Sequence, residues 1–144
     1  MAIIYFDSSA LVKLVVEEAG SELAAELWDG CDAAVASRVT YPEVRAALAA
    51  AGRNHDLDQP GQAVAESAWE EYWSATRPVE LTRAVEQRAG QLAARHALRG
   101  ADAVHLASAL AVSEPGLILA AWDRRLRAGA QAAGLGITPA DPLT

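Results

Sequence analysis

The sequence predicts an α/β fold in which helices cover both faces of a central parallel sheet. Two apolar runs, residues 2–6 and 117–122, have the length and composition of strands buried on both faces, as in parallel sheets. Further strand candidates alternate with amphipathic helical patterns, the order that produces parallel strands. The chain has 144 residues, 52% hydrophobic and 22% charged, and no repeat or linker divides it. We therefore expect a single globular domain, residues 1–144.

The first half of the chain contains two of the expected strands. Gly20 ends the first helical pattern, and Pro42 and Glu43 fall in the first turn of a later helix that Thr40 caps, where proline is tolerated and an acid is favoured. A polar break at 54–61 precedes a helix that carries three aromatic residues on one face. In order, we expect a strand at 2–6, helices at 9–18 and from 21, a strand at 33–37, and helices from 40 and at 62–75.

The second half repeats the alternation of strands and helices. Thr82 has the character of a helix N-cap, and Gly100 separates two helical patterns. The run LILAAW is fully apolar and is followed directly by Asp123. In order, we expect a strand at 78–81, helices at 82–98 and 101–114, a strand at 117–122, a helix at 124–133 and a short strand at 136–138.

Charge and composition exclude several classes of protein. The net charge is −7, so a protein that binds nucleic acid simply by neutralising phosphates is disfavoured. Cys31 is the single cysteine, which excludes a disulfide framework and fits a reducing cytoplasm. No apolar run reaches the length of a membrane span, and the N-terminus lacks the pattern of a signal peptide. We therefore expect a cytoplasmic protein that has no membrane partner.

Four acidic residues lie where the predicted fold would place them at one edge of the sheet. Asp7 and Asp123 follow apolar strands, and Glu43 and Asp102 lie in first turns of helices. Each has a local explanation, as a strand terminator, a helix cap or a partner of the helix dipole. Together they would repel one another unless a cation compensates, and carboxylates are the ligands that Mg²⁺ and Mn²⁺ prefer. The residues alone leave both explanations open.

Five segments taken together resemble the PIN-domain family, and within it most closely the VapC toxins of type II toxin–antitoxin systems. The resemblance extends from Ile3 to about Thr138, with the order and spacing of the segments preserved. They are YFDSSALVKL, SELAAEL, SRVTYPEVRAAL, LRGADAVHLASAL and LAAWDRRLRAGAQAAGLGI.

The resemblance implies a three-layer α/β/α sandwich and a metal-dependent endoribonuclease that hydrolyses RNA phosphodiester bonds with metal-activated water. It assigns Asp7, Glu43, Asp102 and Asp123 to a quartet that binds Mg²⁺ or Mn²⁺, with Asp7 and Asp102 as the firmest ligands. Ser9 matches the small hydroxyl residue of the family and would orient Asp7. The family further implies a cognate VapB-type antitoxin, an RNA substrate and a homodimer. Ala121 departs from the pattern, because many relatives carry Thr or Ser there.

Other side chains near the acids have simpler interpretations. His105 lies three residues after Asp102 and is interpreted as a packed helix residue rather than a ligand or proton shuttle. The arginines near the later acids contact either RNA phosphates or neighbouring carboxylates. They are Arg99, Arg124 and Arg125.

An antitoxin helix is expected in a groove near the first helices. Candidates to line it are Val12, Val15 and Val16, for which core packing is an equally good account.

Two other functions stay open at this point. An aspartate-nucleophile phosphatase would use Asp7, although the motif DSS lacks the second acid that such enzymes carry two residues later. A non-catalytic module would use the same acids to bind a basic partner. Absence of a phosphoenzyme together with internal RNA cuts would exclude the first, and absence of divalent-ion binding would favour the second.

Overall fold

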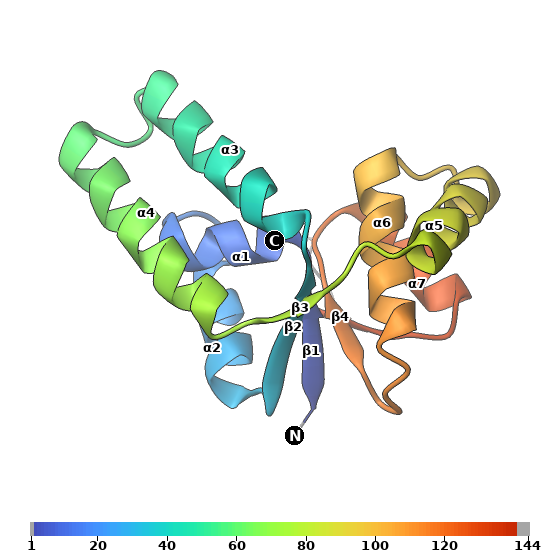
Figure 1. Ribbon diagram of the computed structural model, residues 1–144. Helices are drawn as coiled ribbons and strands as arrows, with labels where there is room; N and C mark the ends of the chain where they lie inside the picture. The colour runs from blue at the N-terminus through green and yellow to red at the C-terminus, as the bar shows by residue number, and fades with distance from the viewer. Residues whose placement is uncertain (1, 141–144) are drawn as a thin grey trace.

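The fold is built around a five-stranded sheet in which every strand pairs in parallel with its neighbours. A computed structural model describes residues 2–140 (Figure 1). The strand order is β3-β2-β1-β4-β5, so β1 lies in the centre. The strands are β1 (Ile3–Phe6), β2 (Ala33–Ser37), β3 (Arg77–Val79), β4 (Ile118–Ala120) and β5 (Gly136–Thr138).

The direction in which the chain adds strands reverses next to β1. The chain first adds β2 and β3 on one side of β1 and then adds β4 and β5 on the other. Tyr5 pairs with Val35 of β2 and with Leu119 of β4, so the carboxyl ends of the three central strands lie at the same edge. In open α/β sheets, ligands bind outside such an edge at the point of reversal. The topology therefore places a site after β1 and β4.

Helices cover both faces of the sheet, which confirms the predicted α/β sandwich. Figure 1 shows α1 to α4 on one side of the sheet and α5 to α7 on the other. The helices are α1 (Ser8–Val15), α2 (Ser21–Gly30), α3 (Thr40–Arg53), α4 (Gln59–Ser74), α5 (Arg83–His96), α6 (Gly100–Ala111) and α7 (Arg124–Ala132).

The two faces of the sheet each have a hydrophobic core, and alternate residues of β1 pack in one core or the other. Ile4 and Phe6 pack in the core beneath α1, α3 and α4, whereas Tyr5 packs with α5, α6 and α7. This follows from the alternation of side chains along a strand. Trp69 is fully buried on the first side, with its ring centroid 5.6 Å from that of Trp73, so the aromatic face of α4 packs in the core.

Several helix ends differ from the sequence prediction for local reasons. The first helix ends at Val15 instead of residue 18, because Val16 is extended and its N–H bonds back to the Val12 carbonyl. The predicted polar break at 54–61 is shorter, since Asp58 caps α4 through the N–H of Gly61. Thr40 lies inside α3, and no side chain caps that helix.

The expected strands at 78–81 and 117–122 are shorter and occupy 77–79 and 118–120. Each pairs over only three residues with its neighbour, which limits its length.

None of the helices in residues 2–140 is both long and apolar enough to span a membrane.

Candidate functional site

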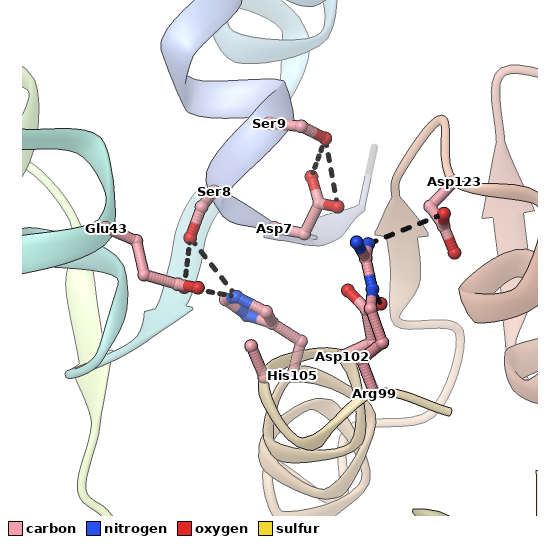
Figure 2. Close-up of a pocket in the computed structure, with 9 residues that line it drawn as sticks. Asp7, Ser8, Ser9, Glu43, Arg99, Asp102, His105 and Asp123 are labelled. Atoms are coloured by element: carbon pink, nitrogen blue, oxygen red, sulfur yellow. Dashed lines mark hydrogen bonds and ion pairs between the residues drawn. The ribbon is translucent and has the colours of Figure 1, made fainter. Parts of the chain in front are cut away.

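A pocket of about 330 Å³ opens at the carboxyl edge of β1 and β4. All four predicted acids and Ser9 line it, which the sequence alone did not establish (Figure 2). The acids come from four separate segments: the ends of β1 and β4 and the first turns of α3 and α6. The lining residues are Asp7, Ser8, Ser9, Glu43, Arg99, Ala101, Asp102, His105 and Asp123.

Asp7 is both the N-cap of α1 and a pocket residue. Its Oδ1 accepts hydrogen bonds from the Ala10 N–H at 2.8 Å and from Ser9 Oγ at 2.9 Å. Its Oδ2 lies 3.1 Å from the same Ser9 hydroxyl. Ser9 therefore fixes the orientation of the Asp7 carboxyl, as the family resemblance implies. The helix-cap explanation for Asp7 is correct and does not exclude a role in the pocket.

Burial dominates the electrostatics of Asp7. Only 3% of the residue is exposed, and this burial raises the pKa of its carboxyl, because the charged form loses hydration. The electrostatic effect of nearby His105 and the hydrogen bonds from Ala10 and Ser9 lower the pKa without cancelling this effect. The negative charge of Asp102 raises it further. No Lys or Arg within the described part of the chain forms an ion pair with Asp7. A bound cation would supply the missing compensation.

Glu43 is held on one wall of the pocket by two donors. Its Oε1 lies 2.8 Å from His105 Nε2 and accepts a hydrogen bond from Ser8 Oγ at 2.5 Å. Burial on its own would raise the pKa of Glu43, but the hydrogen bonds from His105 and Ser8 outweigh it and leave the pKa below its ordinary value. Glu43 is therefore ionised at neutral pH.

Arg99 bridges two acids on the opposite wall. Its Nε lies 3.0 Å from Asp102 Oδ2, and its Nη2 lies 3.8 Å from Asp123 Oδ1. The Arg99 side chain is 75% exposed, so these contacts are weak and solvated. Asp123 is also the N-cap of α7, through the Leu126 N–H at 2.9 Å. Arg124 and Arg125 are exposed and do not line the pocket.

The acids form an open site and not a closed cage. Figure 2 shows Glu43 with Ser8 and His105 on one side, and Arg99 with Asp102 and Asp123 on the other. Within residues 2–140, no group of three or more His, Cys, Asp or Glu side chains is already arranged around one point as a metal cage. Mg²⁺ keeps several waters and commonly binds through one or two carboxylates, so it needs no such cage. The hard oxygen donors and the uncompensated Asp7 fit Mg²⁺ or Mn²⁺.

Three polar residues of the site were given no role there by the sequence. His105 is buried, as its interpretation as a packed helix residue predicts, but it also contacts Glu43 and lies 2.7 Å from the Tyr5 hydroxyl. Ser8 binds Glu43 directly. The available signal was the spacing of three residues between Asp102 and His105, which places both on one face of α6. Nothing in the sequence pointed to Tyr5.

Comparisons with known proteins identify the family. The PIN-domain profile matches residues 4–131. Ribonuclease VapC45 and ribonuclease VapC49, from two strains of Mycobacterium tuberculosis, are each 67% identical over 140 residues, or 97% of both chains. A solved toxin–antitoxin complex from Klebsiella pneumoniae shares the fold, with a TM-score of 0.61, 21% identity and coverage of 85% of this chain and 87% of that one. The chain therefore belongs to the PIN-domain family and, within it, to the VapC type.

Proposed function

We propose that this protein is a metal-dependent endoribonuclease and the toxin component of a toxin–antitoxin pair. One observation carries the proposal: four acids from four segments line one pocket at the reversal point of the sheet. Among them Asp7 is buried, and no Lys or Arg in residues 2–140 forms an ion pair with it. The names of the two relatives at 67% identity support an RNA substrate. The pocket chemistry supports the requirement for a divalent cation.

Each pocket residue has a distinct part in the proposed reaction. Asp7 and Asp102 hold the cation most firmly, and Glu43 and Asp123 complete its surroundings. Ser9 keeps the Asp7 carboxyl oriented through its hydroxyl. Bound Mg²⁺ or Mn²⁺ supplies charge stabilisation to the attacking and leaving oxygens of a phosphodiester. Arg99 is exposed beside the acids, where it can leave them to contact an RNA phosphate.

The residue that orients Asp7 disfavours it as the nucleophile of a phosphatase. Ser9 holds the Asp7 carboxyl through its hydroxyl. Ser9 stands two residues later, where that chemistry needs an acid. Water is therefore the proposed nucleophile, and no covalent intermediate is expected.

The proposed function is tested by the products formed from defined RNAs. Purified protein with Mg²⁺ or Mn²⁺ should cut end-labelled RNA at internal positions, and DNA of the same sequence should stay intact. Gel separation of the labelled fragments locates the cuts. A metal-replete protein that leaves a broad set of single-stranded and structured RNAs uncut, yet binds a basic partner protein, would instead indicate a non-catalytic acidic module.

A groove between α1 and α3 is the proposed docking site for the antitoxin. It has a volume of about 550 Å³ and an acidic rim, which suits a helix with one apolar face and basic flanks. Val12 and Val16 line this groove, and Val15 does not. All three valines also pack against the core beneath α1. Its lining residues are Val12, Val16, Glu17, Glu18, Ala47, Ala50, Ala51, Asn54 and Asp56. The homodimer and the cytoplasmic location stay predictions.

Ala50→Arg should weaken binding of the co-expressed antitoxin by on the order of tenfold, because it fills the groove and adds a positive charge. Arginine is a good helix former, so α3 should be retained. Ala63→Arg makes the same change at an exposed position of α4 outside the groove and is the matched control. Calorimetry of both variants with purified antitoxin measures the difference. Equal affinities would place the antitoxin elsewhere.

A further inference from the structure

A chain of hydrogen bonds runs from the core of the sheet to Glu43. The Ser37 N–H on β2 donates to the Tyr5 hydroxyl at 3.1 Å, and this hydroxyl lies 2.7 Å from His105 Nδ1. His105 Nε2 then lies 2.8 Å from Glu43 Oε1. The chain connects β2, β1, α6 and α3, and Tyr5 and His105 are 0% and 2% exposed. Solvent therefore does not provide alternative partners for either of these side chains.

The Tyr5 end of the chain anchors the His105 ring. Burial raises the pKa of Tyr5, so the phenol keeps its proton. The Tyr5 hydroxyl accepts the Ser37 N–H of β2 and lies 2.7 Å from His105 Nδ1. A side chain of the central strand therefore holds one nitrogen of the ring in the core.

The Glu43 end of the chain holds the other nitrogen of the ring. His105 Nε2 lies 2.8 Å from Glu43 Oε1, and the hydrogen bond from His105 lowers the pKa of Glu43. Because Glu43 is ionised and can only accept hydrogen bonds, Nε2 is the donor. The buried ring is therefore contacted at both nitrogens, by Tyr5 in the core and by Glu43 at the pocket.

The donors to Glu43 converge on one of its two oxygens. His105 and Ser8 both bind Oε1, and no described residue donates a hydrogen bond to Oε2. Ser8 also lies 3.2 Å from His105 Nε2, so the three side chains form one compact group, visible in Figure 2. A carboxylate held in this way by a buried ring has little rotational freedom. Its second oxygen remains available to a ligand in the pocket.

We propose that His105 is a positioning residue: anchored in the core by the Tyr5 hydroxyl, it fixes Glu43 with one oxygen free for the cation. The proposal rests on the metal site of the proposed function. Partners that orient ligand carboxylates commonly contribute tenfold or more to metal affinity. His105 itself touches neither the cation nor the substrate.

Three variants test the role from both ends of this chain of hydrogen bonds. His105→Gln keeps a donor toward Glu43, whereas His105→Met fills the space without one. Tyr5→Phe keeps the aromatic ring and removes the hydroxyl that anchors His105.

The metal affinity of wild type and of these variants is measured by electron paramagnetic resonance of free Mn²⁺. His105→Met should bind Mn²⁺ about tenfold more weakly than wild type, and His105→Gln, whose amide can replace the Nε2–H donor, should stay within about threefold. His96→Met, at the end of α5 and outside the pocket, is the control for loss of an imidazole. Circular dichroism checks each variant for folding. If His105→Met does not fold, Tyr5→Phe takes its place in the comparison.

The outcomes separate this proposal from the proposed function. Failure of wild type to bind Mn²⁺ would overturn the metal site, and with it the positioning role. If wild type binds Mn²⁺ and His105→Met binds it equally well, only the positioning role is overturned. The same holds if His105→Gln is as weak as His105→Met, because the donor to Glu43 would then be irrelevant.

Discussion

Asp7→Asn should abolish RNA cleavage and leave the metal-free protein at least as stable as wild type. Removing a cation ligand should cost on the order of a thousandfold in rate, since metal ions supply several kcal/mol of transition-state stabilisation. Asparagine caps helices as well as aspartate does, so the bond to the Ala10 N–H is retained. The variant lacks only the charge, whose burial the wild-type pocket compensates only in part.

The pH dependence of stability follows from the same residue. The pKa of Asp7 is raised above its ordinary value of 3.8, so the folded protein binds this proton more tightly than the unfolded chain does. Metal-free wild type therefore loses stability from this residue as the pH rises from about 3.8 through the raised value. Asp7→Asn does not titrate and avoids this loss. At neutral pH it should be more stable by up to about 1 kcal/mol, or roughly 2–4 °C in Tm.

Thermal melts of three proteins, with and without Mn²⁺, measure these effects. Asp7→Ala removes both the charge and the cap, so it should be about 1 kcal/mol less stable than Asp7→Asn. Mn²⁺ should raise the Tm of wild type more than that of either variant, because ligand binding stabilises the native state by mass action. A clearly lower metal-free Tm for Asp7→Asn, together with an unchanged Mn²⁺ shift, would reduce Asp7 to a structural cap.

Removal of divalent metal should stop cleavage without unfolding the protein. Excess EDTA is expected to lower the rate by on the order of a thousandfold, and added Mn²⁺ or Mg²⁺ should restore it. The fold does not depend on the ion, because Asp7 and Asp123 already bond to the N–H groups of their helices. The far-ultraviolet circular dichroism spectrum should therefore be the same with and without EDTA.

A labelled substrate completes the test of the metal-dependent mechanism. RNA that carries ³²P at internal phosphates should transfer no label to the protein during turnover. Cleavage that persists in excess EDTA, or label that remains on the denatured protein, would contradict hydrolysis by water at a metal site.

The elements that position the acids were predictable because their signals are local. An apolar run that ends at Phe6 and is followed by Asp7 indicates both the central strand and the start of a helix, and the structure has both. The same holds for β4 and Asp123, which caps α7. Once parallel strands are inferred, the common edge of the acids follows from the chain order. Boundaries such as the end of α1 depend on the extended conformation of Val16, which no sequence pattern showed.

The group around His105 was not predictable, because its contacts are made between distant segments. Tyr5 and His105 are 100 residues apart in sequence, and His105 and Glu43 are 62 apart. Tyr5 lies inside an apolar strand and resembles any core residue there. His105 lies in an apolar helix, where a packed imidazole is the common case. For Arg99 the sequence left RNA phosphates and neighbouring carboxylates open as partners, and the structure pairs it with Asp102 and Asp123.

Asp7 and Asp123 are both helix caps and pocket acids, and this affects which mutations can inactivate the protein without unfolding it. One transition changes an aspartate codon to an asparagine codon, which removes the charge and keeps the capping oxygen. In cells selected to escape a harmful ribonuclease, these two codons offer folded, inactive alleles in a single step. Such alleles would still occupy the antitoxin. They would therefore leave less antitoxin free to restrain any active copy in the same cell.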